Sequence, residues 1–255
     1  MNLPKSYDQL DQWETAMFLY ESGLKEINTK IEILNNEFKH VHNYNPIEHV
    51  KSRLKSPESI VKKLKKYGYD ETIANMLDYV NDVAGIRIIC SFSSDIYKIA
   101  DMLKQQDDIT VLTVKDYFAN PKPNGYKSYH MVVSVPIFLA EGPVDTKVEI
   151  QIRTIAMDFW ASLEHKIYYK FEGNAPENIS EDLKACADIV DMLDRKMLSL
   201  NEAVQVAAAE QAAQKEAEQL AMKEKNRRQM EEMAEAAEAS GDERSAAGVV
   251  KVVQV

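Results

Sequence analysis

The sequence contains little glycine, proline or cysteine. Its 255 residues include 8 Gly and 8 Pro, which argues against a loop-rich all-β fold. Its two cysteines, Cys90 and Cys186, are far apart and match neither a metal-binding spacing nor a disulfide framework. No apolar run approaches the roughly 18 residues of a membrane-spanning helix, and residues 1–12 do not resemble a secretory signal. We therefore expect a cytoplasmic protein with no transmembrane segment.

The sequence also contains fewer basic than acidic residues. The chain has 31 Lys and Arg against 41 Asp and Glu, a formal net charge of −10. Such a chain is a poor general binder of nucleic acid, because that binding depends on neutralising phosphates. A site that handles phosphate must therefore be a local basic patch on an acidic body.

Hydrophobic periodicity predicts two kinds of secondary structure. Apolar residues at three- and four-residue steps predict helices at 13–38, 57–68, 70–81, 95–103, 154–171 and 180–201. Ser56, Ser94 or Asp95, and Thr154 are the expected N-caps of three of them. Alternating patterns predict strands at 86–92, 109–114, 129–135 and 147–153. Residues 47–55 receive no assignment, and a turn is expected at 43–46. The order of elements predicts an α+β fold.

The expected domain covers residues 1–202, and residues 203–255 form a tail. The tail is rich in Ala, Glu, Gln and Lys and contains no aromatic residue. This composition favours helix but offers little apolar surface to bury. We expect a solvated or frayed helix that gives way to an unstructured end at 241–255.

A first candidate cluster is basic and surrounds the second predicted helix. It comprises Arg53, Lys55, Lys62, Lys63, Lys65 and Lys66. Ser59, Lys63 and Lys66 share one helix face by spacing and could hold a polyphosphate. The alternative is an ordinary solvated helix face.

A second candidate is the segment from Asp82 to Arg87. A carboxylate entering a strand can hold Mg²⁺, and Gly85 allows a ligand to approach the backbone closely. The alternative is a helix-ending Asp and a surface Arg.

A third candidate is the loop 115–130, where lysines alternate with tyrosines. An aromatic ring can stack on a base while a nearby lysine contacts phosphate. The alternative is a proline-containing loop whose tyrosines serve packing, with His130 satisfied inside the sheet.

A fourth candidate is the polar face of the last predicted strand, formed by Glu149, Gln151 and Arg153. An acid, an amide and a guanidinium projecting from one strand could bind a metal, a base edge and a phosphate. The alternative is the solvated side of a sheet.

Taken in order, these segments resemble the synthetase domain of the RelA/SpoT family, and most closely its single-domain small alarmone synthetases of the RelQ type. The resemblance covers residues 10–200. It rests on 46–55 (Pro-Ile-Glu leading to Arg-Leu-Lys), 82–87 (Asp-Val-Ala-Gly-Ile-Arg), 122–130 (Lys-Pro-Asn-Gly-Tyr-Lys-Ser-Tyr-His), and 148–154 (Val-Glu-Ile-Gln-Ile-Arg-Thr) followed by Phe159-Trp160-Ala161 and Glu164-His165.

The resemblance implies a nucleotidyltransferase-like mixed β-sheet flanked by helices. It also implies a GTP/GDP pyrophosphokinase of the stringent response, a transferase that moves the β,γ-pyrophosphate of ATP to the 3′-hydroxyl of GDP or GTP. The products would be AMP and the alarmone (p)ppGpp.

The resemblance also implies roles for individual residues. ATP would be held by Arg53, Lys55, Ser59, Lys63 and Arg87, the last stacking on adenine. Asp82 and Glu149 would bind Mg²⁺, and Glu149 is the candidate general base. The guanosine nucleotide would be held by Lys115, Lys122, Tyr126, His130 and Gln151, with Tyr126 stacking on guanine.

Some features differ from the family pattern. None of the five histidines is followed by Asp, so we expect no hydrolase activity of the HD type found in long family members. Thr113 replaces an Arg found in many long enzymes, which leaves the preference among GDP, GTP and GMP open. The resemblance further implies a homotetramer. Because His49 stands where an aromatic residue is known, allosteric control by (p)ppGpp stays open, as does binding of RNA.

One alternative from another class is a nucleotide-sensing or RNA-binding module that keeps the fold without catalysis. Retention of Asp82 and Glu149 argues against it. Another nucleotidyltransferase activity on the same fold is a further alternative, and the Asn-Gly-Tyr loop favours a guanine acceptor over it.

Overall fold

The computed structural model of the chain describes residues 9–42, 44–170 and 178–239. The chain divides into two units, Met1–Leu198 and Ser199–Val255, and each is described by itself. The end at Phe171 of the helix expected at 154–171, the unstructured end expected at 241–255 and Asn43 of the expected turn lie outside the described residues.

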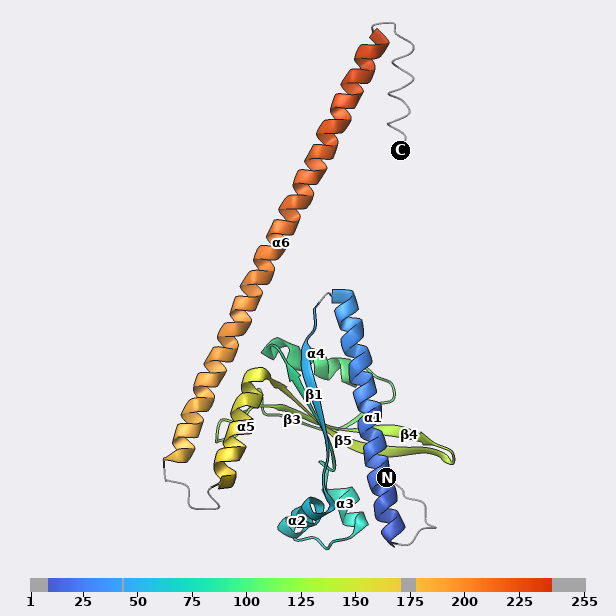
Figure 1. Ribbon diagram of the computed structural model, residues 1–255, viewed down its shortest axis with the longest axis vertical. Coiled ribbons are helices and arrows are strands. Elements are labelled where there is room, and N and C mark those ends of the chain that lie inside the picture. Colours follow the sequence, from blue (N-terminus) through green and yellow to red (C-terminus); the bar gives the residue numbers. More distant parts are fainter. Residues whose placement is uncertain (1–8, 43, 171–177, 240–255) are drawn as a thin grey trace. The chain divides into compact units, whose positions relative to one another are not determined.

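A five-stranded mixed sheet forms the centre of the first unit (Figure 1). Its strands are β1 (Ile47–Leu54), β2 (Ala84–Cys90), β3 (Thr110–Asp116), β4 (Tyr129–Leu139) and β5 (Gly142–Thr154). They lie in the order β1-β2-β5-β4-β3, with β2 and β5 parallel and the other neighbours antiparallel. The predicted α+β class with a mixed sheet is confirmed.

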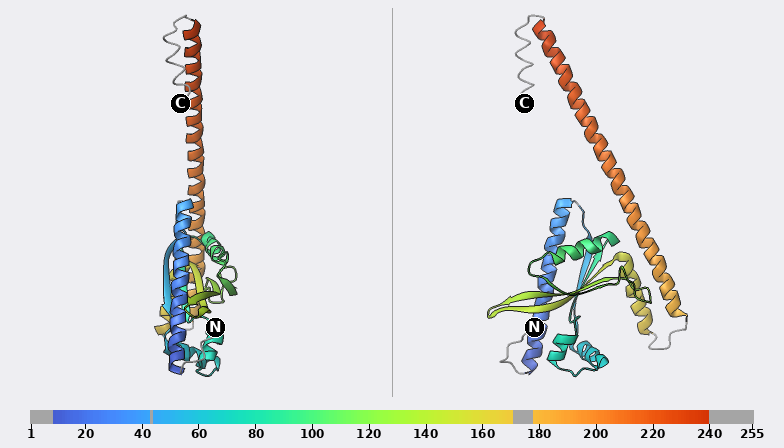
Figure 2. Two further views of the ribbon diagram at one scale, coloured as in Figure 1. Left: turned by 90° about the vertical axis from the view of Figure 1, so that its right-hand side faces the viewer. Right: turned by 180° about the vertical axis from the view of Figure 1, so that it is seen from behind.

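The described ranges contain six helices: α1 (Gln9–His42), α2 (Pro57–Tyr67), α3 (Ile73–Tyr79), α4 (Ser93–Lys104), α5 (Ile155–Lys170) and α6 (Ile179–Ala239), the last of which runs from the first unit into the second. Helix α1 crosses the sheet and contacts β1, β2, β4 and β5 (Figure 2). Alternate residues of the strands, such as Ile88, Met131 and Ile150, are fully buried with α1 and α4 in one core. The residues between them point to the opposite face, which α2 and α3 border at one end and α5 at the other (Figure 1).

Local sequence signals fix the ends of several helices. Ser56 caps α2 by accepting a hydrogen bond from the Ser59 N–H, and Pro57 occupies the first turn. Gly68 ends α2 in the left-handed conformation at φ 78°. The hydroxyl of Thr154 accepts from the Met157 N–H at the start of α5. The predictions for Ser56 and Thr154 are confirmed.

Three predictions about secondary structure need correction. Residues 47–54, which the sequence left unassigned, form edge strand β1; five of its eight side chains are polar and exposed, so the segment shows no clear alternation. Helix α3 begins after Thr72, whose hydroxyl caps Asn75, and is shorter than the expected 70–81. Phe92 occupies the N-cap position of α4 and makes no side-chain cap, so packing of the helix overrides the expected caps Ser94 and Asp95.

Helix α6 is longer than the helix predicted at 180–201, because it continues through the Ala-rich segment to Ala239. The part within the second unit is almost entirely exposed, including Val204 and Leu220. High helix propensity with little apolar surface explains why this segment is helical without packing on a core of its own. Among the described helices, none combines the length and the apolar character that crossing a membrane requires.

Within the first unit, the beginning of α6 holds the loop that leads into β4. Lys127 forms an ion pair with Asp191, and the Trp160 indole of α5 donates to the Leu183 carbonyl at 2.8 Å. Gly125 has φ 86°, and a Cβ atom there would lie 2.5 Å from the Cβ of Ala187. The loop can therefore approach α6 only with glycine at this position.

Substitution of Gly125 by Ala should destabilise the fold far more than substitution of Gly68. Gly68 has a similar φ of 78° but open space around it, so Gly68→Ala should cost only about 1 kcal/mol of conformational strain. Gly125→Ala should cost a further 1–3 kcal/mol, approximately, from the clash with Ala187. Urea unfolding of both variants measures the difference. Ala187→Gly should recover part of the loss in the Gly125→Ala background; equal losses at both glycines would contradict this packing.

Candidate functional site

The register of the sheet aligns polar residues from all five strands on the face opposite the core. One row runs across the sheet through Lys51, Arg87, Gln151, His130 and Lys115. The next row runs through Arg53, Gly85, Glu149, Val132 and Thr113. Residues two apart on a strand share a face, so both rows project to the same side. Segments up to 100 residues apart in the chain thus meet on one surface.

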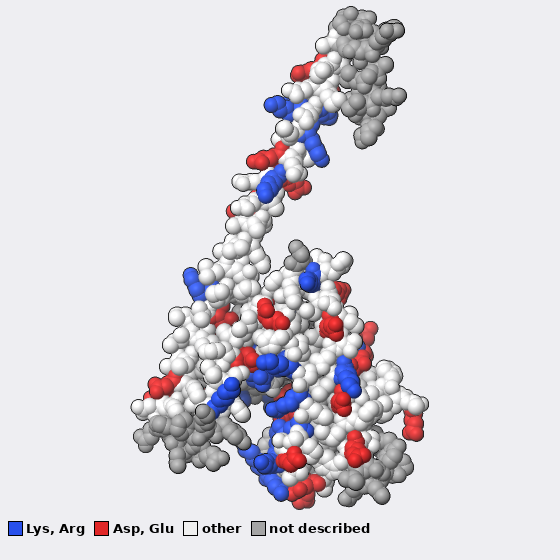
Figure 3. Space-filling model, viewed as in Figure 1, with Lys and Arg blue, Asp and Glu red and all other residues white. Residues whose placement is uncertain are grey.

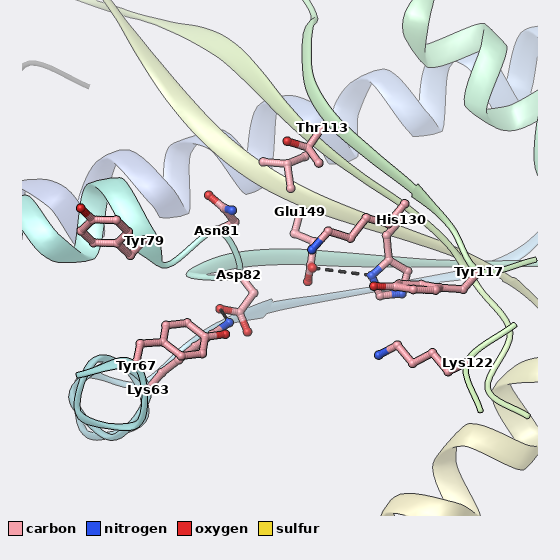
Figure 4. Close-up of a pocket in the computed structure, with 12 residues that line it drawn as sticks. Lys63, Tyr67, Tyr79, Asn81, Asp82, Thr113, Tyr117, Lys122, His130 and Glu149 are labelled. Atoms are coloured by element: carbon pink, nitrogen blue, oxygen red, sulfur yellow. Dashed lines mark hydrogen bonds and ion pairs between the residues drawn. The ribbon is translucent and has the colours of Figure 1, made fainter. Parts of the chain in front are cut away.

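A cavity of about 260 Å³ opens over the β4 side of this surface (Figure 4). We call it the tyrosine cavity, because Tyr67, Tyr79 and Tyr117 line it. Its other lining residues are Lys63, Asn81, Asp82, Thr113, Lys115, Lys122, His130, Val132 and Glu149. In Figure 4, Lys63 and Tyr67 come from α2 at one end, and Lys122 comes from the loop before β4 at the other.

A second cavity of about 360 Å³ lies over the β1 side. We call it the arginine cavity, because Arg53 and Arg87 line it. Its other lining residues are Lys51, Ser52, Asp82, Gly85, Ile86, Glu149 and Gln151. The two cavities share only Asp82 and Glu149, so these carboxylates stand at the border between them.

Asp82 lies in the turn before β2 and is held by two lysines. Lys55 contacts one carboxylate oxygen at 2.9 Å and Lys63 contacts the other at 2.7 Å. Burial by itself would raise the pKa of Asp82, but the hydrogen bonds from Lys63 and Lys55 outweigh burial and hold that pKa below its usual range. Asp82 is therefore ionised at neutral pH.

Glu149 lies in the middle of β5. Its Oε2 accepts a hydrogen bond from the Gln151 amide at 2.9 Å, and its Oε1 lies 3.7 Å from Nδ1 of His130. Burial and the nearby Asp82 favour the protonated form, but His130 and Gln151 outweigh them and lower the pKa of Glu149. The border between the cavities thus carries two ionised carboxylates surrounded by cationic and polar groups.

Arg153 corrects the expectation of an open polar row on β5. It is only 5% exposed, and its guanidinium is bound to protein groups. It donates to Asp158 at 3.0 Å, to the Tyr126 hydroxyl at 2.6 Å and to Gln151 at 3.1 Å. Helix α5 covers this end of the sheet face, so Arg153 does not project into a cavity to bind phosphate.

Two other residues with predicted roles, Tyr126 and Ser59, lie outside the cavities. Tyr126 lines neither cavity; its ring meets Lys122 Nζ at 4.9 Å and Arg153 Cζ at 5.1 Å, and its hydroxyl is hydrogen bonded to His130 at 2.8 Å. Ser59 is exposed, its hydroxyl accepts a hydrogen bond from the hydroxyl of the N-cap Ser56 at 3.0 Å, and it also lies outside both cavities. The remaining predicted residues line a cavity, except Lys55, which reaches the border through Asp82. Gln151, expected with the guanosine nucleotide, lines the arginine cavity, and Lys63, expected with ATP, lines the tyrosine cavity.

The basic residues around the cavities form the local positive patch that the composition requires. Figure 3 shows Lys and Arg side chains gathered around a hollow on one face of the molecule. Within the first cluster, only Arg53, Lys55 and Lys63 take part in the site; Lys62, Lys65 and Lys66 are exposed. For those three residues, the alternative of a solvated helix face is the better description.

Sequence reasoning missed several residues of the site. Tyr67, Tyr79 and Asn81 line the tyrosine cavity, and Lys51 lines the arginine cavity. Tyr67 lies four residues after Lys63, a helical neighbour position that could have signalled it, and the Lys63 ammonium is 5.6 Å from its ring. Lys51 carries no such signal, because β1 itself was not recognised.

The donor set at the border suits a magnesium ion held together with a polyphosphate. Asp82 and Glu149 offer carboxylate oxygens to both cavities. Across the described ranges, no group of three or more His, Cys, Asp and Glu side chains forms a self-sufficient metal site. Magnesium is commonly bound by one or two carboxylates while phosphates and water complete its shell, so these residues fit the expected ion.

Comparison with known proteins identifies the family. A family model for the region found in RelA / SpoT proteins matches residues 52–174. The GTP pyrophosphokinase YwaC of Bacillus subtilis is 47% identical over 195 residues, which cover 76% of this chain and 93% of that protein. The chain belongs to the RelA/SpoT family.

Solved structures agree with this assignment. The small alarmone synthetase 2 from Bacillus subtilis aligns with a TM-score of 0.68 and 46% identity, covering 74% of this chain and 98% of that one. The small alarmone synthetase 1 from Bacillus subtilis, bound to its product pppGpp, aligns with a TM-score of 0.70 and 34% identity, covering 76% and 98%. The expected resemblance of this RelA/SpoT chain to small alarmone synthetases, and its nucleotidyltransferase-like fold, are confirmed.

Replacement of Asp82 by Asn should destabilise the protein in the absence of nucleotide. The side chains of Lys55 and Lys63 are only 13% and 25% exposed, and the variant would leave both cations without their counter-charge. We expect a loss of about 1–3 kcal/mol in urea unfolding. Asp101→Asn is the control, since it breaks a surface pair with Lys104 and should cost less than about 0.5 kcal/mol. Equal stability of Asp82→Asn and wild type would refute this view of the pair.

Proposed function

We propose that the chain is a GTP pyrophosphokinase that transfers the β,γ-pyrophosphoryl group of ATP to the 3′-hydroxyl of GDP or GTP. The observation that carries the proposal is the pair of cavities that share Asp82 and Glu149. A transfer between two nucleotides needs two binding spaces that meet where the group is exchanged. The activity named for the relatives, and the product bound in one of them, support the same reaction.

The arginine cavity is the site for ATP in this proposal. Arg53 and Arg87 project into it and can contact phosphate and the adenine ring respectively. Lys55 and Lys63 reach the border of the cavity and can neutralise the β- and γ-phosphates. Lys51, which the sequence did not suggest, adds a further cation on the same side.

The tyrosine cavity is the site for the guanosine nucleotide. Lys115 and Lys122 supply positive charge for its phosphates, and Tyr117 supplies a ring within the cavity. Lys122 Nζ lies 4.7 Å and 4.9 Å from the rings of Tyr117 and Tyr126. Movement of this flexible lysine toward phosphate would free a face of Tyr126 for stacking on guanine.

The transfer step balances with the residues at the border. The 3′-oxygen of the acceptor bonds to the β-phosphorus of ATP, the bond from that phosphorus to the α,β-bridging oxygen breaks, and AMP leaves with the electron pair. Glu149, ionised because of its lowered pKa, accepts the proton of the 3′-hydroxyl. Gln151 and His130 hold the Glu149 carboxylate in place on either side.

Asp82 and Glu149 would hold Mg²⁺ at this border. The ion would supply charge neutralisation for the transferred phosphates. Asp82 would exchange one or both of its lysine contacts for the ion, which leaves Lys55 and Lys63 free to contact the triphosphate. The two lysines at the border would then pair with the substrate phosphates instead of with Asp82.

The proposal assigns synthesis without hydrolysis to this chain. Long family members carry a metal-dependent hydrolase domain with a His-Asp pair, and no His-Asp pair occurs in this sequence. The products are therefore expected to accumulate rather than be degraded by the same protein.

Incubation with Mg²⁺, ATP and GDP should yield AMP and a guanosine that carries a 3′-pyrophosphate. Chromatographic product analysis with GMP, GDP and GTP in parallel measures both the reaction and the preference for acceptor. Wild-type protein that releases ADP or inorganic phosphate instead of AMP would refute the proposal. Purified product returned to the protein without ATP should stay intact if hydrolysis is absent.

In the same assay, Glu149→Gln should lower kcat by about 10²-fold or more, because the amide cannot accept the proton. Glu141→Gln, an exposed change in the β4–β5 hairpin, is the matched control and should retain wild-type activity. Near-normal turnover of Glu149→Gln would exclude Glu149 as the base.

We also propose that the protein is a homotetramer, as the family resemblance implies. Large apolar side chains on one stretch of α6 support this proposal, because Ile189, Leu193 and Met197 are 50–60% exposed within the first unit. Phe159 on α5 is 60% exposed as well. Apolar side chains gathered in this way are typical of surfaces that associate.

Light scattering should give four times the 29.0 kDa mass of one chain at micromolar concentration. Leu193→Glu should shift the mass toward smaller species, because a charge would replace apolar contact area. Asp182→Asn, also on α6 but polar in both forms, should leave the mass unchanged. A monomeric wild-type protein would contradict the tetramer.

A further inference from the structure

Two arginines of the site share one carboxylate oxygen. Arg87 on β2 and Arg153 on β5 belong to neighbouring parallel strands and project from the same face. The guanidinium of Arg87 contacts Oδ1 of Asp158 at 3.2 Å, and that of Arg153 contacts the same oxygen at 3.0 Å. Asp158, in the first turn of α5, is thus the bridge between a residue of the arginine cavity and a residue buried beneath α5.

The Asp158 carboxylate offsets the repulsion between the two neighbouring guanidinium groups. The side chains of Arg153 and Asp158 are 6% and 13% exposed, so solvent screens their charges poorly. Burial and the adjacent Arg153 lower the pKa of Arg87, while Asp158 opposes that effect. The Nε of Arg87 is buried without a hydrogen-bond partner, which leaves Asp158 as the carboxylate that orients this guanidinium. Without it, two like charges would repel each other at the edge of the cavity.

From Arg153, hydrogen bonds lead to Glu149 by two routes. On one route, Arg153 donates to Gln151 at 3.1 Å and Gln151 donates to Glu149 at 2.9 Å. On the other, Arg153 donates to the Tyr126 hydroxyl at 2.6 Å, which is hydrogen bonded to His130 at 2.8 Å; His130 then lies 3.7 Å from Glu149. The first route passes through Gln151, which lines the arginine cavity, and the second ends at His130, which lines the tyrosine cavity.

We propose that Asp158 is a positioning residue that couples the two nucleotide sites: it orients Arg87 toward ATP and, through Arg153, holds Gln151 against Glu149 and Tyr126 against His130 on the acceptor side. The inference rests on the proposed function of the two cavities. When ATP contacts the Arg87 guanidinium that Asp158 orients, Arg87 draws less on the carboxylate, and more of its charge is available to Arg153. Arg153 is then held more firmly, and the acceptor groups that it contacts are ordered before the acceptor arrives.

This arrangement predicts positive cooperativity between the substrates, because the nucleotide that binds first has already ordered groups used by the second. Reciprocity requires that the acceptor strengthen the binding of ATP by the same factor. If Asp158 only stabilised the fold, its replacement would leave this coupling factor unchanged as long as the protein stayed folded.

The experiment measures binding without turnover. AMPCPP, in which a methylene group replaces the α,β-bridging oxygen, serves as the ATP probe, and GDP serves as the acceptor, both with Mg²⁺. Titration calorimetry of each nucleotide, alone and with the other at saturation, gives the coupling factor. For wild type we expect the first nucleotide to strengthen binding of the second about fivefold or more.

Two variants separate positioning from stability. Asp158→Asn keeps the shape of the side chain but removes its charge; it should weaken AMPCPP binding and bring the coupling factor close to one. Tyr126→Phe keeps the ring but removes the hydroxyl that Arg153 contacts; it should reduce coupling while AMPCPP alone binds as to wild type. Asp145→Asn, an exposed Asp on β5, is the matched control and should behave as wild type.

Steady-state kinetics provide the second readout. Asp158→Asn should raise KM for ATP more than it lowers kcat, since Glu149 itself remains in place. A coupling factor in Asp158→Asn equal to that of wild type, or independent binding of the two nucleotides to wild type, would overturn the inference while product formation upheld the proposed function. Absence of AMP and 3′-pyrophosphorylated product from wild type would instead overturn the proposed function.

Discussion

Parallel pairing of β2 with β5 is the constraint on which the site depends. It places Gly85 opposite Glu149 and Arg87 opposite Gln151, although more than 60 residues separate these partners in the chain. Because Gly85 has no side chain, the space beside Glu149 stays open toward Asp82 at the start of β2. The antiparallel neighbours then extend the same rows to Arg53 on one side and to Lys115 on the other. A shift of one residue in this register would turn Glu149 into the core and bury it without partners.

The electrostatics of the border follow from this geometry. Two partly buried carboxylates close to each other would normally favour protonation of at least one. Here Lys55 and Lys63 neutralise Asp82, while His130 and Gln151 support Glu149, so the pKa of each carboxyl is lowered. Lys55 and Lys63 therefore pair with Asp82 in the free protein. In the proposed reaction, the same lysines would contact the polyphosphate and Asp82 would contact the metal ion.

The packing of helices α5 and α6 explains why the loop before β4 can carry the residues that we propose for acceptor binding. Loops are usually mobile, but this one is fixed by the ion pair of Lys127 with Asp191, by the close contact of Gly125 with Ala187, and by the hydrogen bond of Asn124 to Glu164. Helices α5 and α6 thus act as the support for Tyr126 and Lys122. The same α5 contributes Asp158, so one helix contacts both this loop and Arg87 of the arginine cavity.

By itself, the sequence determined the elements with strong local signals and most of the polar residues that line the two cavities. Ser56, Pro57 and Gly68 define α2, alternation defines β2, β4 and β5, and ordered motifs identify Asp82, Glu149 and the family. Only the tertiary structure decided which polar residues face a cavity. Arg153 looks like an open ligand by alternation but is buried beneath α5, while Lys51 and Tyr79 carry no motif yet line the site. Alternation gives the face of a strand, whereas exposure on that face depends on which distant helix covers it, and no local pattern encodes that contact.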